Sequence, residues 1–271
     1  MTRSTGARFS ITGADVYERS IGRWSRRLAP GFRDFCGPVA GRVLDIGCGT
    51  GILAEQLLRD DAVTAVVGID LAAPLLERAR AAVRDPRAGF ARADAARLPF
   101  ADDAFDRSIS LLVVNFLADR VRCIREAVRV TRPGGTVAAT VWDMRGGFMF
   151  ARFAWDLAAA LDPAAARERD ELFHTRFLRP GSLEALWHEA GLAEVRGGAL
   201  AVDLAYADFD DYWQPIVGNG QAFARYFAAL PDAAQARLRD TVRAAYLTGD
   251  DDGPRSFAAR AFAVTGRVPE K

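Results

Sequence analysis

Residues 43–51 read VLDIGCGTG, an apolar stretch that runs directly into a turn with glycines at positions 47, 49 and 51. Glycine has no Cβ, so a ligand can approach the backbone of such a turn closely. The dinucleotide fingerprint G-x-G-x-x-G would need its third glycine at position 52, where this chain has Ile52, and the lysine of a P-loop is absent as well. The stretch predicts a buried strand, a ligand-binding loop and a helix, and it weakens a dinucleotide-binding interpretation.

Outward from this loop, short apolar runs alternate with helical patterns through residue 142. This alternation is typical of strand–helix–strand units, which build a parallel sheet covered by helices on both faces. The class is therefore α/β with a doubly wound sheet. The pattern predicts five strands at residues 42–46, 62–69, 90–93, 105–114 and 136–142, with helices between them.

Beyond residue 143 the pattern loosens. It predicts a helix at 181–190, a sixth strand at 194–204, an aromatic-rich helical segment at 207–248 and a closing strand at 256–265. The expected division of the chain is a helical lid at 1–40, a ligand-binding core at 41–145, a continuation of that core at 146–206, an aromatic helical insertion at 207–252 that caps the substrate, and a closing strand at 253–271.

The composition is that of an ordinary folded protein, with 50% apolar and 26% charged residues in a chain of 271. Its 36 basic and 35 acidic side chains leave a net charge of +1, which gives no field for gripping nucleic acid. Three widely spaced cysteines argue against a disulfide framework and suit a reducing compartment. With no signal-peptide pattern and no apolar run of roughly 18 residues, we expect a cytoplasmic protein without a membrane span.

Two carboxylates flank the glycine loop. Asp45 precedes the loop in the first predicted strand, and Asp70 ends the second. Because the carboxyl ends of parallel strands meet at one edge of a sheet, we expect both side chains to face one cleft. Asp45 would repel a pyrophosphate and attract an ammonium or sulfonium group, and Asp70 could accept hydrogen bonds from both ribose hydroxyls. These residues predict a nucleoside ligand with a positively charged tail.

Five segments follow one another along the chain: VLDIGCGTG, VVGIDLAAPLLERAR, ADAARLPFADDAFD, SISLLVVNFLAD and EAVRVTRPGGTVAATVWD. In this order and spacing they resemble the class I S-adenosylmethionine-dependent methyltransferases, particularly the branch of the ubiquinone and menaquinone methyltransferases. The similarity covers about residues 15–143. It implies a mostly parallel, seven-stranded Rossmann-like sheet with a helical cap, S-adenosylmethionine as the cofactor and S-adenosylhomocysteine as its product. The carboxyl-terminal half follows the family only in general plan, so the acceptor does not transfer.

The resemblance also implies roles for individual residues. The methionine part would be held by the glycine loop, the ribose by Asp70, and the adenine by residues that follow the second and third strands. The cofactor-binding residues implied in this way are Asp45, Gly47, Cys48, Gly49, Asp70, Leu71, Asp94, Ala95 and Leu111. Tyr17 and Arg23, in YERSIGRW, match positions that close over the methionine carboxylate in similar enzymes. Asp94 has an alternative interpretation as the cap of a turn.

Methyl transfer from a sulfonium needs alignment and desolvation rather than a covalent enzyme intermediate, so the lack of a catalytic triad does not argue against it. We expect transfer by in-line displacement to a small, partly apolar acceptor. His174 is the candidate base for a phenol or an amine, and the residues expected around the acceptor are Asn115, Phe116, Trp142 and Trp213. His174 and the aromatic residues of 209–246 have an alternative interpretation as purely structural.

Two other classes stay open at this point: a nicotinamide-dependent oxidoreductase on a related sheet, and a non-catalytic protein that binds the adenosyl ligand. We expect a small-molecule partner, with no metal, no nucleic acid and no membrane span. The acceptor atom, the pathway and the oligomeric state, a homodimer included, are left undetermined by the sequence.

Overall fold

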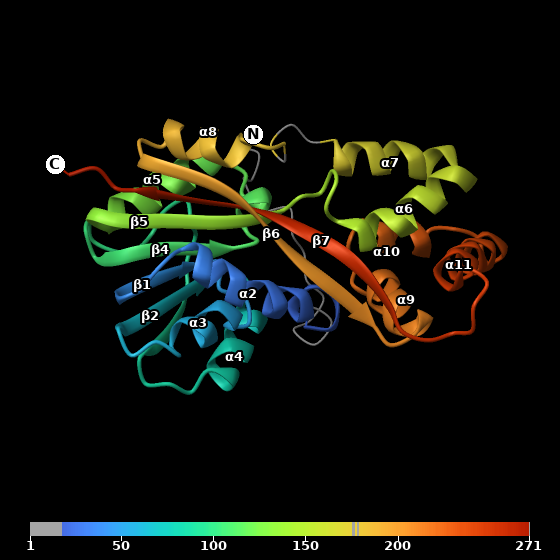
Figure 1. Cartoon of the computed structure of the whole chain (residues 1–271), viewed down its shortest axis with the longest axis horizontal. Coiled ribbons are helices and arrows are strands. Elements are labelled where there is room, and N and C mark those ends of the chain that lie inside the picture. The colour runs from blue at the N-terminus through green and yellow to red at the C-terminus, as the bar shows by residue number, and fades with distance from the viewer. Residues whose placement is uncertain (1–17, 175–176, 178, 271) are drawn as a thin grey trace.

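The computed structural model describes residues 18–174, 177 and 179–270, which form a seven-stranded sheet flanked by helices (Figure 1). The strand order is β3-β2-β1-β4-β5-β7-β6. Strands β1 to β5 pair in parallel, whereas β7 runs antiparallel to β5 and to β6. The predicted doubly wound, mostly parallel sheet is therefore confirmed. The strands are β1 Gly41–Ile46, β2 Val63–Asp70, β3 Ala88–Arg92, β4 Phe105–Leu111, β5 Thr131–Trp142, β6 Ala193–Tyr206 and β7 Arg255–Arg267.

Helices cover both faces of the sheet because successive side chains of a strand point to opposite faces. In β1, Val43 belongs to an apolar cluster with α2 and α3, whereas Leu44 and Ile46 belong to a cluster with α5 and α8. A strand that is buried on both faces is expected to be rich in apolar residues, as β1 is with Val43, Leu44 and Ile46. The flanking helices are α2 Arg23–Phe35, α3 Ile52–Leu57 and α4 Ala73–Ala82, and on the second face α5 Arg120–Val130 and α8 Ser182–Glu189.

Strands β6 and β7 continue past the rest of the sheet and carry a helical cap. They pair with each other as far as Tyr206↔Arg255, whereas β5 pairs with β7 only as far as Trp142↔Ala261. The outer part of this two-stranded ribbon shares one aromatic-rich core with the surrounding helices. Figure 1 shows these helices gathered at the far end of the ribbon: α6 Met149–Leu161, α7 Pro163–Phe173, α9 Phe209–Gly218, α10 Ala222–Ala228 and α11 Asp232–Leu247.

The cap begins with α6, earlier in the chain than the insertion expected at 207–252. Helices α6 and α7 lie within the expected core continuation at 146–206, yet Trp155 of α6 and Phe173 of α7 pack in the same cluster as Trp213 and Tyr246. The reason is that the segment after β5 leaves the sheet at its carboxyl edge and meets the ribbon beside β7, where Phe148 pairs with Ala259. Of the segment at 1–40, which the sequence predicts to be a lid, the structure describes the short π-helix η1 Glu18–Gly22 and α2, and the lid role stays a prediction.

Strand β4 ends at Leu111, three residues before the end of the strand predicted at 105–114. After Leu111, Leu112 adopts a left-handed φ of +64° and donates its N–H to the carbonyl of Thr140 at 3.0 Å. Such a φ is uncommon for a residue other than glycine. The chain then enters the 3-10 helix η2 Val114–Phe116. The apolar pattern could not reveal this turn, because Leu112, which makes the turn, and Val114, which follows it, are both buried.

Within the described part of the chain, none of the helices combines the length and the apolarity that a membrane crossing requires.

Candidate functional site

The glycine loop at the end of β1 is built around left-handed backbone. Gly47, Gly49 and Gly51 have φ values of +71°, +54° and +86°. The N–H groups of Gly47 and Cys48 both donate to the carbonyl of Ile69 in β2, at 2.8 and 2.9 Å, so the loop is fastened to the neighbouring strand. A Cβ on Gly47 would lie 2.5 Å from Cγ2 of Val113. The loop therefore requires glycine both for its conformation and for its close packing.

Asp70 at the tip of β2 is held rigidly against this loop. Its Oδ2 accepts the N–H of Gly49 at 3.0 Å, and its Oδ1 accepts the N–H of Ala72 at 2.9 Å. The side chain is half-buried. Each carboxylate oxygen can accept more than one hydrogen bond, so both oxygens keep capacity for the hydroxyls of a ligand.

Asp45, in β1, pairs in register with Gly68 of β2, and it is 1% exposed. Neither of its carboxyl oxygens has a hydrogen-bond partner among the described residues. Burial, and then the negative charge of Asp70, raise the pKa of Asp45 to about 8. A buried carboxyl group without a partner is unfavourable for folding, and such orphaned groups point to a binding or catalytic role. A positively charged ligand group would supply the missing partner.

The neighbouring positions complete this edge of the sheet. Leu71, directly after β2, is 45% exposed, which leaves its apolar side chain free to cover a ring. Asp94, two residues after β3, accepts the N–H of Ala96 at 2.9 Å and so caps the turn that contains the buried Ala95. Leu111 ends β4. The strand order thus places positions from β3, β2, β1 and β4 in succession along one carboxyl edge.

Cys48 is a spacer in the loop rather than a nucleophile. Its thiol is buried, and burial, followed by the charges of Asp45 and Asp70, raises the pKa of Cys48 far above its ordinary value. The thiol is therefore protonated at neutral pH, and reactivity of a cysteine depends on the thiolate.

Arg23 is engaged with the cap and not with the glycine loop. Its guanidinium binds both carboxylate oxygens of Asp211 in α9, at 2.6 and 2.9 Å, and donates to the carbonyl of Ala205 at 2.8 Å. It also stacks on the ring of Trp24, 4.1 Å from the ring centre. Arg23 therefore ties α2 to the cap. Its expected contact with the methionine carboxylate stays a prediction, and Tyr17 lies outside the described residues.

Two further expected residues also lie in the cap. His174 follows α7, its side chain is 51% exposed, and its Nδ1 is 3.7 Å from the carboxylate of Asp170. Trp213 in α9 is 2% exposed and stacks on Phe209, with 5.7 Å between ring centres. The ring contacts of Trp213 are those of a core residue. Its surroundings therefore match the alternative interpretation, in which the aromatic residues of 209–246 are purely structural.

Of the residues expected around the acceptor, Asn115 and Phe116 lie half-buried in η2, and Trp142 ends β5 with 5% exposure. Among the residues that the structure describes, the indole Nε1 of Trp142 has no hydrogen-bond partner, and neither has the hydroxyl of Thr140, which is fully buried. Sequence reasoning missed Thr140. Its position two residues before Trp142, which puts both on one face of β5, was the available signal.

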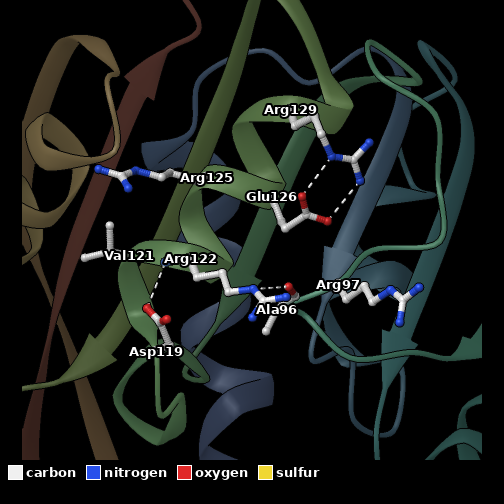
Figure 2. Close-up of a pocket in the computed structure, with 8 residues that line it drawn as sticks. All are labelled: Ala96, Arg97, Asp119, Val121, Arg122, Arg125, Glu126 and Arg129. Carbon is white, nitrogen blue, oxygen red and sulfur yellow. Dashed lines mark hydrogen bonds and ion pairs between the residues drawn. The ribbon is translucent and has the colours of Figure 1, made fainter.

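A hollow of about 720 Å³, open to solvent, lies on the outer side of α5 (Figure 2). Arg129 pairs there with Glu126, and Arg122 donates to the carbonyl of Ala96. No residue of the glycine loop lines it, so it is separate from the edge that carries Asp45 and Asp70. The lining residues are Ala96, Arg97, Asp119, Val121, Arg122, Arg125, Glu126 and Arg129. Over the described ranges, no cluster of three potential metal ligands occurs.

Comparisons with known proteins agree with this geometry. Residues 44–139 match a family model described as a methyltransferase domain. An uncharacterised protein of Mycobacterium tuberculosis is 37% identical over 162 residues, which are 57% of this chain and 58% of that protein. A demethylmenaquinone methyltransferase of Roseiflexus is 39% identical over 101 residues, which are 37% of this chain and 42% of that enzyme. The chain therefore spans less than two thirds of the length of these relatives.

Among solved structures, phosphoethanolamine N-methyltransferase 2 of Haemonchus contortus, in complex with S-adenosylmethionine, matches with a TM-score of 0.58. The match covers 96% of this chain and 57% of the other at 19% identity, and similarity at that level shows the fold. Residues 44–139, which contain the glycine loop, Asp70 and Leu111, are therefore a methyltransferase domain, and the resemblance to the S-adenosylmethionine-dependent methyltransferases is confirmed.

Proposed function

We propose that this chain is an S-adenosylmethionine-dependent methyltransferase that methylates a small, partly apolar molecule by in-line displacement. The observation that carries the proposal is Asp45, a carboxyl group that is 1% exposed and has no partner among the described residues, beside the glycine loop. When bound, S-adenosylmethionine supplies an electrophilic methyl group on a sulfonium sulfur. A ligand with an ammonium and a sulfonium matches an unpaired carboxylate, whereas a dinucleotide pyrophosphate would be repelled by it.

The residues at the carboxyl edge fit the parts of this cofactor in the order of the strands. In the proposal, Asp94, Ala95 and Leu71 hold the adenine, and Asp70 holds the ribose hydroxyls. Asp45, the loop residues Gly47, Cys48 and Gly49, and the carbonyl of Leu111 hold the methionine part. The two hydrogen bonds that fix Asp70 support its role, because an oriented carboxylate loses little freedom when a ligand binds.

The chain contributes to the reaction by alignment and by exclusion of water. Trp24 and Leu28 of α2 are buried in one cluster with Leu112 and Trp142, so the lid covers the ends of β4 and β5 with apolar side chains. Correct alignment of reacting atoms can supply about 7 to 11 kcal/mol of the barrier. His174 would act as a base only where the acceptor loses a proton, and its half-exposed position at the end of α7 supports no role beyond that.

The acceptor can be identified without presupposing its class. Cell extract incubated with the protein and methyl-labelled S-adenosylmethionine should yield a labelled small molecule, detected by untargeted mass spectrometry. Calorimetry with S-adenosylhomocysteine and with NADH separates the oxidoreductase alternative, since binding of NADH alone would refute the proposal. A protein that binds S-adenosylhomocysteine tightly and labels nothing would be a sensor or a scaffold.

Asp70→Ala should weaken binding of S-adenosylhomocysteine by about 1 to 3 kcal/mol, because hydrogen bonds to a charged group are lost. Calorimetric titration measures this. Asp34→Ala is the matched control, since Asp34 lies at the end of α2 with its side chain 70% exposed, and it should bind as the wild type does. A 2′-deoxy analogue of the ligand distinguishes a ribose contact from loop anchoring: if the variant still discriminates against the analogue, Asp70 does not bind that hydroxyl.

Gly47→Ala should reduce the affinity for S-adenosylhomocysteine at least about tenfold, because the loop must distort to accept a Cβ at a φ of +71° and 2.5 Å from Val113. Gly31→Ala is the matched control. Gly31 is exposed within α2 and has no atom within 4 Å of a built Cβ, so that variant should bind normally and gain about 0.4 to 1 kcal/mol of stability. Wild-type affinity in a folded Gly47→Ala protein would contradict the close approach of the ligand to the loop.

A further inference from the structure

The order of the strands leaves one part of the carboxyl edge for the acceptor. Asp94, Asp70 and Asp45 belong to β3, β2 and β1, which are consecutive neighbours in the sheet, and β4 and β5 follow on the other side of β1. If the cofactor lies along these three strands and reaches the carbonyl of Leu111 at the end of β4, as the proposed function requires, the molecule that receives the methyl group lies beyond it, over the ends of β4 and β5. The following inference rests on that function.

Two buried polar groups at the end of β5 have no partner. The hydroxyl of Thr140 and the indole Nε1 of Trp142 are unpaired among the described residues, and the two side chains are 0% and 5% exposed. Thr140 stands in register with Leu111, the residue that ends β4. Both residues share a strand face with Ala138, which packs in the cluster of α2 and α3, and this is also the face of Asp45. The two groups therefore lie on the lid side, next to the expected methyl donor.

Comparable buried groups, one in the same strand and one in α8, are satisfied. The hydroxyl of Thr131 donates to the carbonyl of Ala127 at 2.7 Å and contacts the hydroxyl of Ser108 at 2.7 Å. Trp187, on the opposite face of the sheet, donates its Nε1 to the carbonyl of Val137 at 2.9 Å. Buried polar groups in folded proteins almost always have partners, so two orphans that are neighbours on one strand face point to a ligand.

The surroundings of these two groups are apolar and aromatic. Trp142 packs against Phe148, with 5.4 Å between ring centres, and shares its cluster with Trp24, Leu28 and Leu112. An indole N–H can only donate, whereas a threonine hydroxyl can donate or accept. We propose that Thr140 and Trp142 orient the acceptor by hydrogen bonds to one of its oxygen atoms, a hydroxyl or a carbonyl, on an otherwise apolar molecule.

The test measures binding of matched probes to the full chain saturated with S-adenosylhomocysteine. The probes are 2-naphthol with naphthalene, and cyclohexanone with cyclohexane, so that each pair differs in its oxygen. The variants are Thr140→Val and Trp142→Phe, which keep the approximate shape and remove the polar group. Thr131→Val and Trp187→Phe are the controls, because they remove groups that already have protein partners. Indole N–H resonances report Trp142 directly, and Trp187 serves as the internal reference.

We expect at least one oxygen-bearing probe to bind the wild type more tightly than its hydrocarbon, to shift the Trp142 resonance, and to bind each variant about tenfold more weakly. Thr140→Val should keep or raise the melting temperature, since it removes an unpaired buried hydroxyl, whereas Thr131→Val should lower it. Equal binding by wild type and variants, or no preference of the wild type for either oxygen-bearing probe, would overturn the inference. Failure of S-adenosylhomocysteine to bind would instead refute the proposed function. Binding of the probe pairs would then be compared on the chain without S-adenosylhomocysteine.

Discussion

Asp45→Asn should stabilise the folded protein at pH 8 and, at the same time, weaken its affinity for S-adenosylmethionine about 10- to 100-fold. The two effects have one cause. The carboxyl group of Asp45 is 1% exposed and has no partner among the described residues, so its ionisation is unfavourable until a cationic ligand arrives. Asparagine has the same shape and no charge. The variant avoids the cost of burying a charge and loses a charged hydrogen bond to the ligand.

The pH dependence of stability has a definite sign. The pKa of Asp45 is about 8 in the folded chain and 3.8 as its ordinary value, so between these values the folded state binds more protons than the unfolded state. Stability from this group is complete below about pH 4 and is lost as the pH rises toward 8. The stability difference between Asp45→Asn and wild type should therefore grow from pH 5 to pH 8, by at least about 1.4 kcal/mol, the equivalent of one pKa unit.

Chemical denaturation at a series of pH values measures the stability difference, and calorimetry measures the affinity. Asp143→Asn is the control, since Asp143 is equally buried but its Oδ2 accepts Nε of Arg260 at 2.9 Å and its Oδ1 accepts the N–H of Gly146 at 3.0 Å. That variant should lose stability at both pH values. A stability difference for Asp45→Asn that is the same at pH 5 and pH 8 would show that Asp45 is ionised throughout, and the argument for a cationic ligand would fail.

Trp213→Ala should destabilise the cap by about 3 to 5 kcal/mol, because a large buried side chain is replaced by a cavity. Trp213 is 2% exposed and lies against Phe209, Phe223 and Phe227, at 5.7, 6.0 and 5.2 Å between ring centres. The carboxyl edge of the sheet that carries Asp45 and Asp70 is built from β1 and β2 and not from the cap helices. We therefore expect affinity for S-adenosylhomocysteine to stay within about twofold of the wild type at temperatures where the variant is folded.

Urea unfolding followed by near-ultraviolet circular dichroism measures this loss. Met149→Ala provides the control within the cap, because Met149 is 44% exposed and its removal should change stability by no more than about 0.5 kcal/mol. If Trp213→Ala leaves stability within 1 kcal/mol of the wild type but abolishes methylation of an identified acceptor, Trp213 contacts the acceptor as the sequence analysis expects.

The sequence predicted the sheet well because strands such as β2 and the second half of β5 are compact runs rich in apolar residues, and such runs next to helical periods have few other solutions. It failed where the backbone departs from the conformation that the apolar pattern favours. The run through Leu112 predicts continued strand, yet Leu112 makes the last ladder hydrogen bond to Thr140 and then turns the chain with a left-handed φ. The assignment of α6 and α7 to the cap was equally hidden, because their apolar faces do not specify which partner they bury against.

The site divides in the same way. Asp45 and Asp70 could be predicted as neighbours, because strand ends of a parallel sheet meet whatever the remainder of the fold does. The engagement of Arg23 with Asp211 could not, because it joins residues 188 positions apart through the cap. The unpaired state of Thr140 and Trp142 also lies beyond sequence reasoning, since absence of a partner is a property of the whole surroundings.

The ribbon of β6 and β7 has a consequence for how such a chain can diversify. It carries the cap from the antiparallel border of the sheet, on strands that contribute nothing to the glycine loop or to Asp70. Mutation, insertion or exchange of the helices at its outer end can therefore alter the cap without disturbing the glycine loop or Asp70. Natural variation should accordingly accumulate after β5.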